Sequence, residues 1–236
     1  MHNALREKAP FDPQAYRLLS ATIERKEMPE KPTKHELKTQ ETRDLLLRAA
    51  EEVFVRDGYA GAELGEIARL AGRTKGSIYA NFKSKEDIFL ALYESKSLER
   101  RAIMQKLLAS SSSTAGNLAA FRKYFIEFAV NDSWAFLLLE FRLYAIRNPE
   151  SRDRLRKLYQ SLLPENEEEA YGAILGRAAK GKKAISRTEA VHTAFAMLTA
   201  LQLEAKFDPS VVTNDVLRRV ASRLFDAMFS ANGAKS

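Results

Sequence analysis

The sequence predicts an all-α fold with two parts, an N-terminal three-helix domain containing a helix-turn-helix and a larger helical domain after it. Glycine and proline are sparse, with 10 and 7 among 236 residues, so long stretches are uninterrupted. Apolar residues recur every three or four positions through most of these stretches, as they do on one face of a helix. Two short helical segments meet at Gly72, which is typical of a helix-turn-helix.

The composition is that of an ordinary globular protein, 45% hydrophobic and 29% charged. The absence of cysteine excludes a disulfide framework, a thiolate metal site and a cysteine nucleophile. His2, His35 and His192 lie far apart and do not have the spacing of metal ligands. The sequence has no glycine-rich phosphate loop and no paired-carboxylate motif. We therefore expect neither an enzyme nor a bound metal or cofactor.

No apolar segment is long enough to cross a bilayer, which takes about 20 residues. The most apolar run, residues 134–146, is interrupted by Glu140 and Arg142. The N-terminus lacks the apolar core of a signal peptide. These features predict a soluble cytoplasmic protein that does not associate with membranes.

Four prolines punctuate residues 1–37, which we expect to form an extension before the first domain. Apolar spacing allows a short helix over about residues 13–26. The mixture of Pro, Lys and Glu over residues 27–38 predicts a mobile linker. The first long helix is expected over about Thr39–Asp57, where apolar pairs recur every four residues until Gly58.

The helix-turn-helix is predicted by the segments on either side of Gly72. The first helix spans about Glu63–Ala71, and Gly72 supplies a positive-φ turn after it. The second helix spans about Thr74–Phe82 and has a threonine as its N-cap. Ile78 and Phe82 lie four residues apart and are expected to face inward together.

The second helix and its flanks carry only positive charge. No acidic residue occurs between Glu66 and Glu86, whereas five lysines and arginines do. Small polar residues and a tyrosine project from the rest of the helix surface. Such a surface suits a polyanion, and in a helix-turn-helix the second helix enters the DNA major groove. An ordinary solvated face is the alternative.

A set of short motifs runs through this region at regular spacing. They are Gly58-Tyr59, Glu66-Ile67-Ala68, Ala71-Gly72, Lys75-Gly76-Ser77-Ile78-Tyr79, Phe82 and Lys85-Glu86. The pattern, over about Lys38–Leu108, resembles the DNA-binding domain of the TetR family of bacterial transcriptional repressors. That family usually has Thr followed by Ser or Thr where this chain has Ala62 and Glu63. The hydroxyl that caps the first helix of the motif and contacts a phosphate is therefore missing.

The resemblance implies DNA contacts from the second helix and its neighbours. The expected DNA-binding residues are Arg73, Thr74, Lys75, Ser77, Tyr79, Asn81, Lys83 and Lys85. Of these, the family pattern implies phosphate contacts for Thr74, Tyr79 and Lys85. It places Lys75 and Ser77 near base edges, where sequence preference is set.

The N-terminal extension leaves three readings open. In the first, Lys31, Lys34, His35 and Lys38 form a basic arm that reaches into the minor groove beside the main site. In the second, the extension is a tail without a role. In the third, translation starts at Met28.

The rest of the chain is predicted to be helical. The predicted division is 1–37 for the extension, 38–84 for the helix-turn-helix domain, 85–110 for a connecting helix and 111–236 for an effector-binding and dimerisation domain. Five helices are expected in the last part, over about Asn117–Asn131, Ser133–Arg147, Glu150–Ala179, Arg187–Phe207 and Thr213–Ala231, the third interrupted near Pro164. The second is apolar nearly all round, which predicts burial in the middle of a domain.

Aromatic residues are concentrated in the middle of the chain and have two readings, a packed core or the lining of a cavity. The TetR resemblance implies an effector cavity, and an apolar lining suits a hydrophobic or amphipathic small molecule. The candidate ligand-binding residues are Phe121, Phe125, Trp134, Phe141, Tyr144 and His192. A hydrogen-bonded core histidine is the alternative for His192.

The last two helices have more apolar surface than one small domain needs to cover itself. Pairs of apolar residues recur every four positions along residues 216–229. The readings are an ordinary intramolecular core and a four-helix dimer interface, and the TetR resemblance implies the dimer. The candidate interface residues are Phe195, Leu198, Val216, Val220, Leu224 and Met228.

These features predict a homodimeric repressor of the TetR type. It is expected to bind a palindromic double-stranded DNA operator and to release it when a small-molecule effector binds. The alternative is a helical protein-interaction module without DNA binding. Salt distinguishes the two, because DNA affinity falls steeply between about 50 and 200 mM salt.

Overall fold

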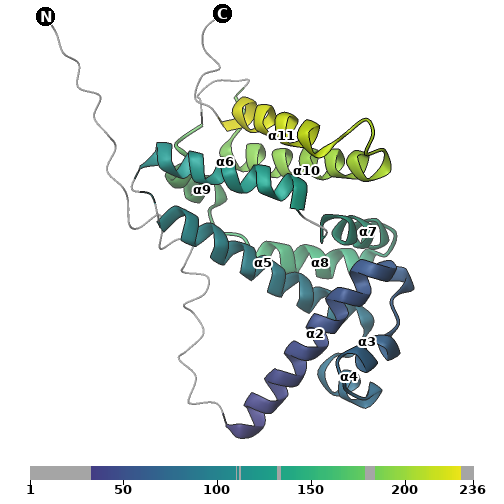
Figure 1. Cartoon of the computed structure of the whole chain (residues 1–236). Helices are drawn as coiled ribbons and strands as arrows, with labels where there is room; N and C mark the ends of the chain where they lie inside the picture. Colours follow the sequence, from purple (N-terminus) through teal and green to yellow (C-terminus); the bar gives the residue numbers. More distant parts are fainter. Residues whose placement is uncertain (1–32, 110, 112, 132–133, 179–183, 230–236) are drawn as a thin grey trace, which may run out of the picture. The chain divides into compact units, whose positions relative to one another are not determined.

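The computed structural model describes residues 33–109, 111, 113–131, 134–178 and 184–229. All regular elements in these ranges are helices, which confirms the all-α prediction (Figure 1). Contacts divide the described chain into two units. One comprises residues 33–102 and 134–163, and we call it the helix-turn-helix unit. The other comprises the described parts of 103–130 and 164–229, and we call it the C-terminal unit.

Helix α2 (Lys34–Gly61) begins five residues before the expected start at Thr39. The reason is a capping box, in which the Thr33 hydroxyl accepts from the Glu36 N–H and the Glu36 carboxylate accepts from the Thr33 N–H. The linker prediction is therefore wrong for residues 34–38, and the rest of the extension lies outside the described residues. Gly58 was predicted to end the helix but instead kinks it, with φ of 73°, and α2 continues to Gly61.

Helices α3 (Leu64–Leu70) and α4 (Lys75–Asn81) form the predicted helix-turn-helix. Gly72 between them has φ of 63°, which confirms the positive-φ turn. The Thr74 hydroxyl accepts from the Ser77 N–H at 3.3 Å and caps α4. Glu63 precedes α3 without a side-chain cap hydrogen bond.

Helix α5 (Lys85–Ala109) starts in the helix-turn-helix unit and ends in the C-terminal unit. The Ser84 hydroxyl accepts from the Asp87 N–H at 3.1 Å. The Asp87 carboxylate accepts in turn from the Lys83 N–H at 2.9 Å, one residue earlier than a standard capping box requires. The cap fixes the turn that joins α4 to α5.

Helices α7 (Trp134–Arg147) and α8 (Pro149–Ser161) belong to the helix-turn-helix unit by their contacts, although the sequence assigned them to the later domain. Aromatic packing explains the difference. The ring of Phe89 stacks with that of Phe141, with centroids 3.9 Å apart, and with that of Trp134 at 5.6 Å. The α7 side chains thus complete the core that α2 to α5 begin.

Helix α7 is not buried all round, in contrast to the prediction. Leu143, Tyr144 and Ile146 are exposed, whereas Leu137 and Phe141 on its other side are buried. The helix is covered on the side that packs against α2, α8 and Phe89 of α5. The hydrophobic composition of α7 therefore predicts more burial than the helix has in a single chain.

The C-terminal unit contains α6 (Thr114–Asn131), α9 (Glu167–Leu175), α10 (Arg187–Phe207) and α11 (Asn214–Phe229). The single interrupted helix expected over Glu150–Ala179 is instead two helices, α8 and α9. Phe125 of α6 and Phe225 and Phe229 of α11 pack with α10 residues in one core. Among the described helices, none combines the length and the hydrophobicity that a membrane span requires.

Candidate nucleic-acid interface

Helix α4 is held by one buried face and presents the other to solvent. Ile78 is fully buried and Phe82, directly after the helix, is nearly so, as their spacing predicted. Tyr79 projects outward with 62% of its surface exposed. Arg73, Thr74 and Lys75 at the start of the helix are exposed as well. We call these outward-facing residues, together with Ser77, the exposed face of α4.

The charge around this face is less uniform than the sequence suggested, because Arg69 is paired. Its guanidinium donates to the Glu66 carboxylate at 2.8 Å, and Arg56 contacts the same carboxylate at 3.5 Å. The hydrogen bond from Arg69 lowers the pKa of Glu66. Lys75 and Lys83 form no ion pair with any described residue. Their charge is therefore available to a polyanion.

Lys85 has a structural role that the sequence did not predict. Its Nζ donates to the carbonyl oxygens of Ala60 at 3.0 Å and Ala62 at 3.1 Å, where α2 ends. It also lies 5.0 Å from the centre of the Tyr59 ring. Burial lowers the pKa of this ammonium group. A cation at this position satisfies helix-terminal carbonyl groups, and its expected phosphate contact remains a prediction.

Asn81 and Ser77 are partly engaged within the helix. The Asn81 side-chain amide donates to the Ser77 carbonyl at 2.8 Å. The Ser77 hydroxyl lies 3.2 Å from the Thr74 hydroxyl, next to the helix cap. The Asn81 carbonyl accepts from Arg43 of α2 at 3.3 Å. Both polar side chains are thus oriented by local hydrogen bonds. Tyr79 extends outward, whereas the exposed Lys75 side chain lies along α3, with its Cε 2.7 Å from the position that a Cβ would take on Gly65.

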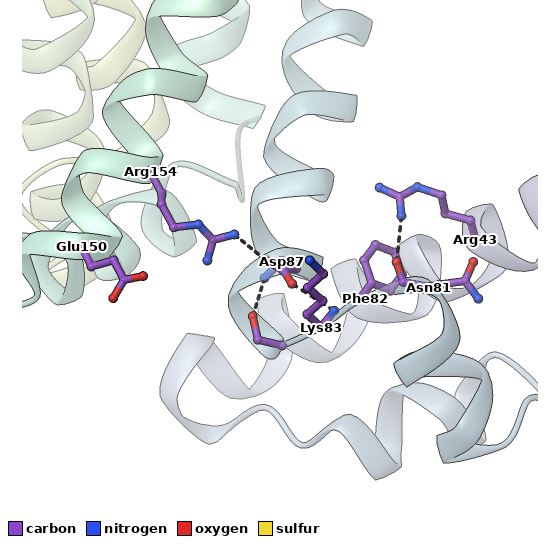
Figure 2. A pocket seen from close by; sticks show the side chains of 8 residues that line it. Arg43, Asn81, Phe82, Lys83, Asp87, Glu150 and Arg154 are labelled. Atoms are coloured by element: carbon purple, nitrogen blue, oxygen red, sulfur yellow. Dashed lines mark hydrogen bonds and ion pairs between the residues drawn. The ribbon is translucent and has the colours of Figure 1, made fainter.

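A polar recess of about 580 Å³ lies beside the end of α4. It is lined by Arg43, Asn81, Phe82, Lys83, Ser84, Asp87, Glu150 and Arg154. Figure 2 shows Arg43 from α2 and Arg154 from α8 on opposite sides, with Lys83 and Asp87 between them. The lining contains both cations and the carboxylates of Asp87 and Glu150, so the recess does not have a charge of one sign.

Arg43 and Arg154 are the residues of this region that sequence reasoning missed. The Arg43 guanidinium lies 4.4 Å from the centre of the Phe82 ring. Arg154 donates to the Glu86 carboxylate at 2.6 Å and also to Asp87. Their positions beside α4 depend on tertiary packing, and the sequence has no local signal for it.

The six candidate ligand-binding residues are divided between the two units. Phe121 and Phe125 are buried in the core of the C-terminal unit, and His192 contacts the Glu167 carboxylate at 2.6 Å in the same unit. Trp134 and Phe141 instead belong to the core of the helix-turn-helix unit. Tyr144 lies against Tyr59 and Phe141 there, with centroids 5.0 and 5.7 Å away. The ligand-binding assignment remains a prediction for each of them.

The candidate dimer residues differ in how much surface they offer. Leu198 is fully buried within its own unit, so it has no surface left for a second subunit. Phe195, Leu224 and Met228 are partly buried against the same core. Val216 is half-buried, and Val220 is 37% exposed. The outward side of α11 therefore retains apolar surface.

Comparison with known proteins supports the interpretation of α2 to α5. Residues 46–92 match the profile described as bacterial regulatory proteins, tetR family. The transcriptional repressor BepR of Brucella suis is 48% identical over 52 residues, which cover 22% of this chain and 25% of BepR. The transcriptional activator FasR of Mycolicibacterium smegmatis is 33% identical over 99 residues, 42% of this chain and 45% of FasR. The chain matches about a quarter of the length of the first curated relatives.

A solved structure resembles most of the chain in fold. The transcriptional regulator FadR of Bacillus subtilis, solved in complex with stearoyl-CoA, superposes with a TM-score of 0.56 at 22% identity. The superposition covers 79% of this chain and 97% of FadR. A likeness at this identity shows the shared fold. The helix-turn-helix segment of this chain, residues 46–92, belongs to the tetR family of bacterial regulatory proteins.

Proposed function

We propose that this protein is a transcriptional regulator that binds a palindromic DNA operator as a homodimer and releases it when a small hydrophobic ligand binds. The observation that carries the proposal is the exposed face of α4. It has a tyrosine, two hydroxyls and lysine and arginine, no carboxylate, and a rigid attachment through Ile78. Such a face supplies phosphate donors and base-reading groups on one element. The family of residues 46–92 supports the same conclusion.

Dimerisation is proposed from the C-terminal helices. α11 presents Leu217, Ala221 and Phe225 to its own core, and Val216 and Val220 lie beside that stripe toward solvent. On α10, Met197 and Leu203 are also exposed. Two copies of α10 and α11 packed about a two-fold axis cover these residues and form a four-helix interface. A two-fold dimer requires a palindromic operator, because each subunit reads one half-site.

The ligand is proposed to bind in the C-terminal unit. Gln202 of α10 is 4% exposed, and its amide donates to the carbonyl groups of Phe128 and Ala129. Its carbonyl oxygen is buried without a hydrogen-bond partner among the described residues. An unsatisfied acceptor among aromatic side chains is a recognition point for a mostly apolar ligand with one donor group. The stearoyl-CoA in the FadR complex gives a precedent for a ligand with a long apolar part.

Regulation by repression is proposed because BepR is described as a repressor. FasR is described as an activator, so activation is the second candidate. A reporter gene placed behind the recovered operator separates the two. Repression predicts higher expression when the regulator gene is deleted, whereas activation predicts lower expression. A cytoplasmic location and the absence of enzymatic activity are part of the same proposal.

The direct experiment is selection of DNA from the host genome. Purified protein is incubated with genomic fragments, and the bound DNA is sequenced. We expect a palindromic site, bound with an affinity that falls by orders of magnitude between about 50 and 200 mM salt. Recovery of random fragments only, with and without candidate ligands, would contradict operator binding. A salt-insensitive association with proteins instead would favour the helical interaction module.

A further inference from the structure

The N-terminal end of α2 extends beyond the core of the helix-turn-helix unit. Every residue from Lys34 to Glu41 is exposed, and the first buried residue of the helix is Leu46. Local bonds hold this segment, including the capping box and a hydrogen bond of 3.0 Å from the Thr39 hydroxyl to the His35 carbonyl. Packing contributes little here, and most helical stability in proteins comes from packing. A helix of this kind has surface available for a partner.

The contact between α2 and α4 fixes where this segment lies. Arg43 donates to the Asn81 carbonyl at the last residue of α4 and covers the Phe82 ring. The nine residues before Arg43 therefore continue α2 for about 14 Å from its contact with the end of α4, at about 1.5 Å per residue. Figure 1 shows the N-terminal end of α2 reaching past α4 in the helix-turn-helix unit. The segment therefore leads away from a contact with the helix that is proposed to enter the major groove.

The side of this segment that continues the buried stripe of α2 carries mainly cations and hydroxyls. Stepping back from Leu46 and Ala49 by three or four residues at a time follows one side of the helix. The cationic and hydroxyl-bearing positions reached are His35, Lys38, Thr39, Thr42 and Arg43, and we call them the N-terminal face of α2. Gln40 and Glu36 are also reached and lie along one edge of this face. These residue types can donate hydrogen bonds to phosphate. The Thr39 hydroxyl and one Arg43 nitrogen already donate to the carbonyl groups of His35 and Asn81, so Lys38 is the exposed cation of this face.

The acidic residues of the segment lie elsewhere or are occupied. Glu41 and Asp44 fall on the opposite side of the helix, because they are offset from the buried stripe. Glu36 is at the edge of the face, and both the N–H and the hydroxyl of Thr33 donate to its carboxylate. Hydrogen bonds from Thr33 lower the pKa of Glu36. The carboxylate nearest the N-terminal face of α2 is thus occupied by Thr33, and the segment as a whole is nearly neutral.

We propose that the N-terminal face of α2 binds the phosphate backbone of the operator next to the major groove that α4 enters. This inference rests on the proposed DNA-binding function and extends its contact surface beyond the helix-turn-helix. Residues 34–38 form a helix, which is too wide for the narrow minor groove and instead suits the backbone. Phosphate contacts of this kind add affinity on every sequence and set the register of α4 on the duplex.

The test compares three variants of the full chain on the operator fragment recovered from the genome. Lys38→Ala removes an exposed cation from the N-terminal face of α2, and Lys38→Arg restores the charge. Arg48→Ala is the matched control, because Arg48 is an exposed cation of the same helix on the side of Glu41 and Asp44. Circular dichroism checks that all variants retain the helix content of the parent. Affinity is measured at about 50 and 200 mM salt.

We expect Lys38→Ala to reduce the salt sensitivity of binding. Each lost phosphate contact lowers the ratio of the affinity at about 50 mM salt to that at about 200 mM salt by about threefold. Because a dimer loses one contact in each subunit, the ratio should fall by about tenfold. A hydroxyl-radical footprint should lose protection only at the outer edges of the two half-sites. Lys38→Arg and Arg48→Ala should match the parent protein. If the parent binds the operator and Lys38→Ala has the same salt dependence and footprint, this inference alone is overturned. If the parent does not bind an operator, the proposed function is overturned as well.

Discussion

The carboxylate of Glu140 accepts a hydrogen bond of 3.1 Å from the backbone N–H of Ala60, across 80 residues of sequence. The other carboxylate oxygen of Glu140 lies 2.7 Å from the position that a Cβ would take on Gly58. Helix α7 therefore fits against the end of α2 because residue 58 has no side chain. The backbone of Gly58 also has φ of 73° and ψ of 171°, a conformation that L-residues avoid.

Gly58→Ala should destabilise the protein by about 1–3 kcal/mol, because the backbone conformation is strained for alanine and the new Cβ displaces Glu140. Urea unfolding at neutral pH measures the change. Gly61→Ala is the matched control, since its Cβ would meet its nearest neighbour at an ordinary 3.7 Å. That variant should be neutral or slightly more stable. Equal losses in both variants would contradict the role assigned to Gly58.

Tyr79→Ala should weaken binding to every DNA sequence by about tenfold, because phosphate contacts carry affinity without sequence information. Ser77→Ala and Lys75→Ala should instead change the preference among operator variants. Competition binding with a panel of single-base operator substitutions measures both effects. The division of roles fails if Tyr79→Ala and Ser77→Ala reduce affinity by the same factor on all of the DNAs tested.

Lys85→Ala should lower stability as well as DNA affinity. Its ammonium group satisfies the carbonyl groups of Ala60 and Ala62, and the loss of these bonds should cost about 1 kcal/mol. Lys83→Ala is the comparison, because Lys83 is exposed two residues earlier. It should reduce DNA affinity and leave the unfolding free energy unchanged. If Lys85→Ala unfolds at the same urea concentration as the parent, the hydrogen bonds to α2 contribute nothing measurable.

The carboxylate of Asp87 should contribute to acid unfolding. Burial by itself raises its pKa, but the hydrogen bond and charge of Arg154, with the N–H of Lys83, outweigh burial and leave the pKa lowered. A lowered folded-state pKa stabilises the protein above the unfolded pKa of about 4, and this stability is lost as the pH falls through the folded value. Arg154→Ala should therefore show a smaller loss of stability between about pH 5 and pH 2.

Denaturant unfolding at a series of pH values measures this difference between the parent and Arg154→Ala. Arg152→Ala is the control, since Arg152 is an exposed arginine of α8 with no ion pair to a described residue. Its pH profile should match that of the parent. Parallel profiles for the parent and Arg154→Ala would show that the ion pair adds nothing to acid sensitivity.

Val220→Glu should convert the proposed dimer to monomers, because it places an unpaired charge in the interface. The dissociation constant should rise by about 100-fold or more. Analytical ultracentrifugation over a range of concentrations measures it. Val55→Glu is the control, as Val55 is 44% exposed in the helix-turn-helix unit. A parent protein that sediments as a monomer, or a Val220→Glu variant that dimerises normally, would refute this interface.

Local chemistry in the sequence was sufficient for the helices and for the helix-turn-helix. Thr74 caps α4, Gly72 has the positive φ that the turn requires, and Ile78 and Phe82 are buried together. Each of these features depends on neighbours within a few residues, which the sequence displays directly. The predicted start of α2 at Thr39 is five residues late, because the composition of residues 27–38 resembles a linker and the Thr33–Glu36 capping box starts the helix within it.

Tertiary structure alone decided which helices share a core and which cations remain free. The stacking of Phe89 on Phe141 assigns α7 to the helix-turn-helix unit, across more than 50 residues of intervening chain. Lys85 and Arg69 looked equivalent to Lys75 and Lys83 in sequence, yet Lys85 binds carbonyl groups of α2 and Arg69 binds Glu66. Hydrophobic and charged contacts are short-ranged and indifferent to sequence separation, so a pattern along the chain determines elements but cannot determine their partners.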